Sequence, residues 1–163
     1  MKNKTNLFLF TSLVVSFMLT GWLFYLSGKR VGDLSVNEQQ DGDFQVCNED
    51  RIFQYYNLDT DYKGGKKAIK QEILSRLESL DFNNPGLITA RFIVNCNGDT
   101  GRFRYKSTDL DLKEIKVNSE NIKKIKSAVL SLQNWNSPEE NKVFDTYYVL
   151  NFKIRNNKIV DIF

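Results

Sequence analysis

Cys47 and Cys96 are the side chains whose types could do chemistry, because the 163-residue chain contains no histidine. A cysteine acts as a nucleophile or a metal ligand in its thiolate form, which a neighbouring base usually generates. Histidine is the commonest such base and the commonest metal ligand. Its absence favours a structural cysteine pair, and we expect a protein that is not an enzyme and uses no cofactor.

A disulfide between Cys47 and Cys96 is our prediction, because we expect this region to lie beyond a membrane, in an oxidising compartment. The bond would close a loop of about 50 residues and constrain the unfolded chain by roughly 3–4 kcal/mol. Two free or buried thiols, or one reactive thiol, are the alternatives. Mass measurement after alkylation, with and without a reductant, separates these cases.

Acidic residues form pairs in three expected loops: Glu49 with Asp50, Asp109 with Asp111, and Glu139 with Glu140. Polar neighbours surround each pair, which is typical of solvated charge. Oxygen ligands between Asn97 and Asp111 could hold Ca²⁺, but their spacing matches no established calcium loop. The chain also lacks the glycine-rich phosphate loop and the zinc-protease motif. We therefore predict no metal site.

Residues 7–26 (LFLFTSLVVSFMLTGWLFYL) carry no charge. As a helix they would be about 30 Å long, enough to cross a bilayer. A cleaved signal peptide has a shorter apolar region and a small-residue cleavage site, and a buried core helix is the other alternative. The length of the run favours a retained anchor. We predict that residues 1–26 form a cytoplasmic N-terminus and a transmembrane signal anchor.

The orientation of this anchor follows from its flanking charges. Lys2 and Lys4 favour a cytoplasmic N-terminus, whereas Lys29 and Arg30 oppose it. The predicted localisation is the inner membrane, as a single-pass protein with its C-terminal domain in the periplasm.

The remainder of the chain divides into a linker and a domain. Residues 27–46 are polar and show no sustained period, which predicts a short periplasmic linker. The domain, residues 47–163, shows helical and extended patterns. Helices are predicted at 66–80 and 120–132, a hairpin at 88–107 around Asn97-Gly98, and strands at 144–155 and 158–163. This order predicts an α+β fold, in which a small antiparallel sheet carries two helices on one face.

The charge of this soluble part excludes one class of partner. Outside residues 1–26 the chain has 21 basic and 20 acidic residues. A nearly neutral surface has no excess positive charge to offset phosphates, so we expect no nucleic-acid binding.

Several short motifs occur in an order that resembles the TonB C-terminal domain family of Bacteroidetes-type energy transducers. They are Tyr62-Lys63-Gly64-Gly65 before the first helix, LDFNNP at 80–85, the hairpin with Phe92-Ile93-Val94, Trp135 with Pro138, and YYVLNFKI at 147–154. The resemblance implies a protein that binds an extended peptide of an outer-membrane transporter by strand addition. It also implies an inner-membrane motor as a second partner.

By position, the resemblance places the partner-binding edge strand within residues 144–155. Its central residues are Tyr147, Tyr148, Val149, Leu150, Asn151 and Phe152. We expect the alternate residues that face the helices to be core. Three features depart from the family: the anchor lacks histidine, the linker lacks a proline-rich rod, and the last strand, 158–163, can cover the edge. An accessory or structural subunit of a cell-envelope complex, without energy transduction, is therefore the alternative function.

Overall fold

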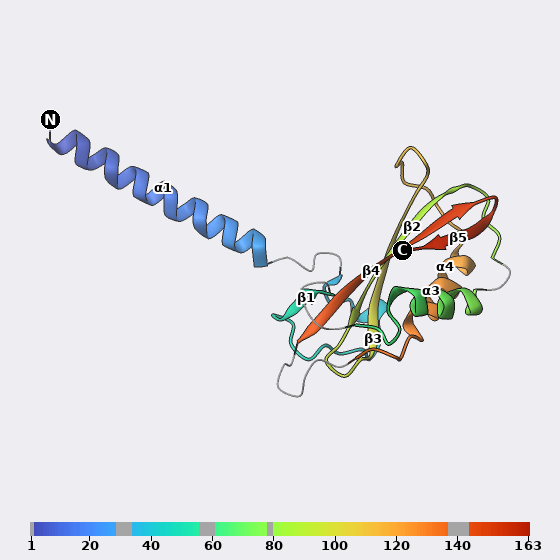
Figure 1. Cartoon of the computed structure of the whole chain (residues 1–163). Helices are drawn as coiled ribbons and strands as arrows, with labels where there is room; N and C mark the ends of the chain where they lie inside the picture. Colours follow the sequence, from blue (N-terminus) through green and yellow to red (C-terminus); the bar gives the residue numbers. More distant parts are fainter. Residues whose placement is uncertain (1, 29–33, 56–60, 78–79, 137–143) are drawn as a thin grey trace. The chain divides into compact units, whose positions relative to one another are not determined.

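The computed structural model describes residues 2–28, 34–55, 61–77, 80–136 and 144–163 (Figure 1). The chain forms two compact units, Met1–Gly32 and Asp33–Phe163. Parts of the expected linker (29–33) and of the first expected domain helix (78–79), together with Pro138, Glu139 and Glu140, lie outside the described residues.

The first unit is helix α1, Lys2–Gly28. Within it, Asn6–Tyr25 has a mean hydropathy of 2.0 and is not buried by the rest of the chain. This segment is long and apolar enough to cross a membrane. It coincides with the uncharged run at 7–26 from which the sequence predicts the anchor.

The second unit is an α+β domain built on a five-stranded sheet. The strands are β1 (Ile52–Gln54), β2 (Gly86–Val94), β3 (Thr100–Thr108), β4 (Asp145–Arg155) and β5 (Lys158–Ile162). Their order is β1-β4-β2-β3, and β5 also pairs with β4. The predicted hairpin is thus β2–β3, with Gly98 in its turn at a φ of 85°.

The sheet is mixed, which corrects the prediction of an antiparallel sheet. β2 pairs antiparallel with β3 and β4, and β5 pairs antiparallel with β4. The short strand β1 runs parallel to β4, with Ile52 opposite Asp145. β1 has no periodic signal in the sequence, because three residues are too few to show alternation.

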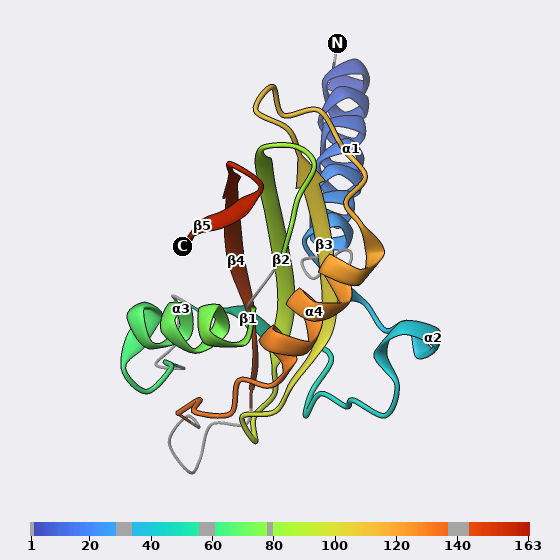
Figure 2. The same cartoon turned by 90° about the vertical axis from the view of Figure 1, so that its right-hand side faces the viewer.

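Two helices, α3 (Gly65–Arg76) and α4 (Ser119–Leu130), lie on the same face of the sheet (Figure 2). α4 crosses this face in front of β2 and β3, and α3 packs beside it. The core between helices and sheet holds Ile69 and Ile73 from α3, Ile125 and Val129 from α4, and Phe92 from β2. The predicted arrangement of two helices on one face is therefore confirmed.

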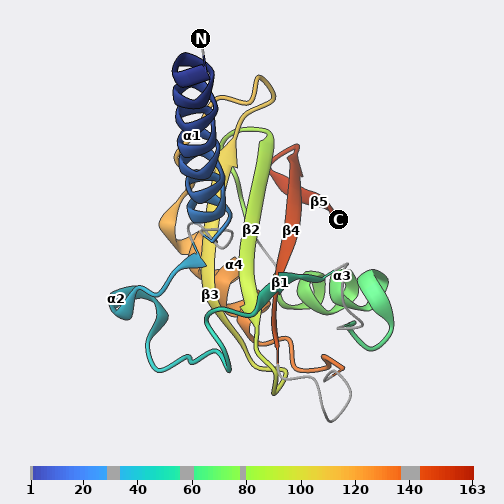
Figure 3. The same ribbon diagram turned by 90° about the vertical axis from the view of Figure 1, so that its left-hand side faces the viewer.

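Figure 3 views the sheet from the face opposite α3 and α4. The alternate residues of each strand lie on this face. They include Thr89 and Arg91 from β2 and Asn151 from β4, all half-buried. The Thr89 hydroxyl donates a hydrogen bond to Asn151 Oδ1 at 2.9 Å. The Arg91 guanidinium lies 5.4 Å from the centre of the Tyr147 ring.

Residues 34–46, which belong to the predicted linker at 27–46, pack against the folded domain. Leu34 is fully buried, and a short helix, α2 (Glu38–Asp41), follows it. The Phe44 ring lies so close to Gly101 that a Cβ atom there would overlap it. A polar segment can fold when one apolar side chain and a few ion pairs fix it to an existing surface, and no sequence period reports such contacts.

Candidate functional site

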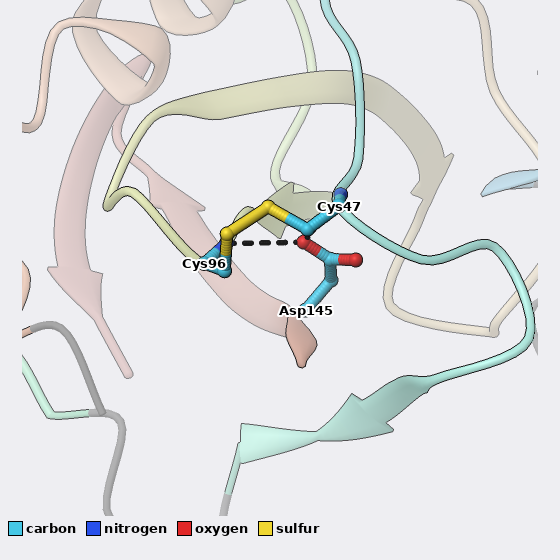
Figure 4. Close-up of side chains that lie close together, drawn as sticks. All are labelled: Cys47, Cys96 and Asp145. Carbon is cyan, nitrogen blue, oxygen red and sulfur yellow. Dashed lines mark hydrogen bonds between the residues drawn. A yellow bond between two sulfur atoms is a disulfide. The ribbon is translucent and has the colours of Figure 1, made fainter. Parts of the chain in front are cut away.

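The predicted disulfide between Cys47 and Cys96 is present, with the two Cα atoms 6.0 Å apart. It joins residues 34–50, which we call the N-terminal segment of the domain, to the turn between β2 and β3. The carboxylate of Asp145 lies beside this disulfide (Figure 4). Asp145 is fully inaccessible to solvent. Asp145 accepts hydrogen bonds from the main-chain N–H groups of Cys47 (3.1 Å), Asn48 (2.8 Å) and Cys96 (3.0 Å).

Cys47, Cys96 and Asp145 lie close enough together to suggest a metal centre, since their candidate ligand atoms are within 4.8 Å of one another. Metal binding by cysteine requires thiolates, and here the two sulfur atoms are bonded to each other. The Asp145 oxygens already accept three N–H groups. The cluster therefore acts as a structural clamp that attaches the N-terminal segment to the sheet.

The outer margin of β4, predicted as the partner-binding edge, is paired with the protein's own chain at both ends. β1 pairs with Asp145–Tyr147, and β5 pairs with residues 152–155. Asn151 adds two main-chain hydrogen bonds to Phe163, at 2.9 and 3.1 Å. Among the described residues, β1 and β5 leave only 148–150 of this margin uncovered. The last strand, which the sequence allowed to cover this edge without deciding the point, pairs with one end of it.

The six predicted edge residues divide between the two faces of the sheet. Tyr148, Leu150 and Phe152 are buried in the core, while Tyr147, Val149 and Asn151 are half-buried on the opposite face. The Tyr148 ring stacks on Tyr55 at 4.3 Å and contacts Trp135 at 4.4 Å. Burial raises the pKa of the Tyr148 hydroxyl above its usual range.

The other margin of the sheet is β3, whose one neighbour among the described strands is β2. Its two ends are covered. At one end, Ile115 donates its main-chain N–H to the Ser107 carbonyl at 3.0 Å. At the other end, the N-terminal segment packs against Gly101 and Arg102. Between these ends, the direction of the main-chain groups follows from Ser107, whose carbonyl points away from β2 to Ile115. Because outward-directed groups alternate along a strand, Tyr105 directs its main-chain N–H and C=O away from β2 as well.

A groove of about 570 Å³ opens along this part of β3, between α2 and α4. We call it the β3 groove, and it is lined by Gln39, Gln40, Phe103, Arg104, Tyr105, Ile122 and Lys126. The Tyr105 side chain is 48% exposed there. The sequence predicted the strand and the helix that form two of its sides, but it did not predict α2 as the third.

The α2 side of the groove is fixed by an ion pair between Arg104 and Asp41. The guanidinium contacts both carboxylate oxygens of Asp41, at 2.6 and 2.9 Å, and both side chains are mostly buried. Arg104 also donates to the Ser35 carbonyl at 3.2 Å. The hydrogen bond from Arg104 holds the pKa of Asp41 below its usual range. The groove wall is therefore preformed.

A second ion pair attaches the same segment at a bulge in β3. Arg102 has a φ of 50° where the β2–β3 register shifts, and its side chain is almost completely buried. Its guanidinium pairs with Glu49 and donates to the Leu34 carbonyl at 3.4 Å. The hydrogen bond from Arg102 lowers the pKa of Glu49. A bulge interrupts the alternation of side chains along a strand and redirects one of them. The bulge in β3 thus allows the Arg102 side chain to reach Leu34 and Glu49 in the N-terminal segment.

The fold and these contacts define a class of protein: an α+β domain, preceded by an apolar helix, with a disulfide clamp and one strand margin that opens on a groove. No family model, curated protein or solved structure matches the chain.

Proposed function

We propose that this protein is a non-enzymatic module of the cell envelope, anchored in the inner membrane by α1, whose periplasmic domain binds another envelope protein. The observation that carries this proposal is the short connection between α1 and the domain. Only residues 29–33 separate Gly28 from the buried Leu34. Whatever its conformation, a chain of this length spans at most about 20 Å.

This reach favours an accessory or structural subunit over an energy transducer of the TonB type. A transducer that works at the outer membrane needs a long rod between anchor and domain. A domain joined to its anchor by so short a connection meets partners at or near the inner membrane. The disulfide clamp supports an exported domain, because such bonds persist in oxidising compartments.

The transducer remains a second candidate because of the order of motifs at 62–154. Strand addition at β4 would then require β5 to leave. β5 is held by the buried Ile162, by the pair between Asn151 and Phe163, and by an ion pair between Lys70 and Asp161. This second candidate predicts that binding depends on the proton gradient.

Crosslinking in intact envelopes, with the full chain in its membrane, tests the proposal. One variant carries thirty Gly/Ser residues inserted at 29–33, and a matched control carries the same insertion after Phe163. Lengthening the tether lowers the effective concentration of the domain near the membrane, so the crosslinked yield should fall several-fold in the first variant only. Equal yields in all three proteins would contradict action near the anchor. A yield that collapses when an uncoupler removes the proton gradient would favour the transducer.

A further inference from the structure

We infer that the β3 groove binds an extended segment of the partner protein that carries apolar and acidic side chains. This inference deepens the proposed function and rests on it, because it assigns the place and the chemistry of the contact. It moves the partner-binding strand from β4 to β3, at the opposite margin of the sheet.

The first argument is the backbone of β3. Alternate residues of an edge strand direct their N–H and C=O groups outward, where another strand can pair with them. Tyr105 is the central outward residue between the two covered ends of β3. From Phe103 to Lys106 the margin is about four residues long, or about 13 Å. The groove therefore suits a short extended segment.

The second argument is the apolar base of the groove. Phe103 and Ile122 are nearly buried, and Tyr105 lies beside Phe103 with the ring centres 6.5 Å apart. A strand added to β3 would direct alternate side chains to this base. An apolar side chain there would bury the exposed part of Tyr105, which favours binding through the hydrophobic effect.

The third argument is charge. Two lining residues are cationic, Arg104 and Lys126, and none is acidic. The charge of Arg104 is neutralised by its ion pair with Asp41, which does not itself line the groove. Lys126 donates to the Gln40 carbonyl at 3.3 Å, and in the described part of the chain it makes no ion pair. An ammonium group in this position favours a carboxylate on the segment that occupies the groove.

The test is a selection of random decapeptides, displayed on phage, against the full-length protein in lipid nanodiscs. Selected peptides should combine apolar and acidic residues, and synthetic copies should bind in solution. Lys126→Glu should weaken them roughly tenfold, whereas Lys124→Glu, an exposed position on the same helix, should leave affinity within about twofold. Selected peptides without acidic residues, or equal losses in both variants, would overturn the assignment of charge.

A second variant tests the backbone contact. Tyr105→Pro removes an outward N–H group and no hydrogen bond to β2, a change that edge strands tolerate. Binding of the selected peptides should be lost, while the melting temperature stays close to that of Tyr105→Ala, which retains the N–H group. Peptides that bind Tyr105→Pro as well as Tyr105→Ala would overturn strand addition at β3. A selection that yields no peptide would overturn the inference as well.

The same variants separate this inference from the proposed function. If envelope crosslinking to a partner survives Tyr105→Pro and Lys126→Glu, the module binds its partner elsewhere and only the β3 assignment fails. If neither peptide binding nor crosslinking is found in the wild type, both proposals fail. Groove variants that change only the binding of phosphatidylglycerol vesicles, with no effect on peptides, would show a lipid contact and overturn the peptide segment.

Discussion

The Oδ1 atom of Asp145 lies 3.0 Å from the main-chain nitrogen of Cys96, so a buried carboxylate holds one half of the disulfide by its backbone. The same oxygen lies 3.1 Å from the nitrogen of Cys47. One side chain at the start of β4 therefore fixes both cysteines. A covalent bond and a set of charge-assisted hydrogen bonds perform the same task, which is to attach the N-terminal segment to the sheet.

Asp145→Asn should strongly destabilise the domain. The amide NH₂ group would face main-chain N–H donors that the carboxylate now accepts, and buried donors without an acceptor are costly. We expect the free energy of unfolding to fall by about 3 kcal/mol, measured by chemical denaturation. Asp111→Asn, at an exposed carboxylate, should change it by less than about 0.5 kcal/mol. Similar values for the two variants would refute the clamp.

Replacing both cysteines by alanine should lower the free energy of unfolding by about 4 kcal/mol, because the loop closed by the disulfide spans 49 positions of sequence. The effect should not simply add to that of Asp145→Asn, since both changes loosen the same attachment. A double-mutant cycle measured by chemical denaturation gives this coupling. Strict additivity would show that Asp145 and the disulfide act independently.

Periodic elements of this fold could be predicted from the sequence because burial of one face imposes a period. Ile69 and Ile73 mark α3, and Ile125 and Val129 mark α4. The Asn97-Gly98 pair marked the hairpin, since a tight turn needs the positive φ that Gly98 adopts. The cysteine pair was predicted from the expected compartment and from the absence of a base.

The elements that complete the candidate site could not be predicted, because isolated contacts between distant segments hold them. α2 has four residues, too few for a helical period, and Arg104 pairs with Asp41 across 63 positions of sequence. Asp145 lies within the predicted strand at 144–155, but its burial depends on the approach of Cys47 and Cys96 from distant parts of the chain. Which strand lies at the margin of the sheet depends on the order of the strands, and short sequence patterns do not encode that order.

Leu34→Ala tests whether the predicted linker is part of the fold. Leu34 is fully buried, so the truncation would leave a cavity and lower the free energy of unfolding by about 3 kcal/mol. Val36→Ala is the matched control, because Val36 is 56% exposed and should change stability by less than about 0.5 kcal/mol. Thermal unfolding followed by circular dichroism measures both. Equal melting temperatures for the two variants would mean that residues 34–46 behave as a linker.

The ion pair between Arg104 and Asp41 should make the attachment of α2 sensitive to acid. Arg104 lowers the pKa of Asp41, so the folded state binds a proton at this site less readily than the unfolded chain. Its stabilising contribution is complete above the ordinary carboxyl range, about pH 4, and is lost as the pH falls through the lower folded value. Glu49, whose pKa Arg102 lowers, acts in the same direction on the same segment.

Asp41→Asn removes this contribution at one site. At pH 7 we expect the variant to be less stable than the wild type by roughly 2 kcal/mol, because Arg104 loses its charged partner in a mostly buried position. Below about pH 4 the wild-type carboxyl also becomes neutral, so the difference between the two proteins should shrink. Denaturation curves at intervals from pH 7 to pH 3 measure this difference directly, and Asp111→Asn supplies the control for solvated charge. A difference of the same size at both ends of this range would exclude the ion pair as the attachment of α2, and with it the preformed wall of the β3 groove.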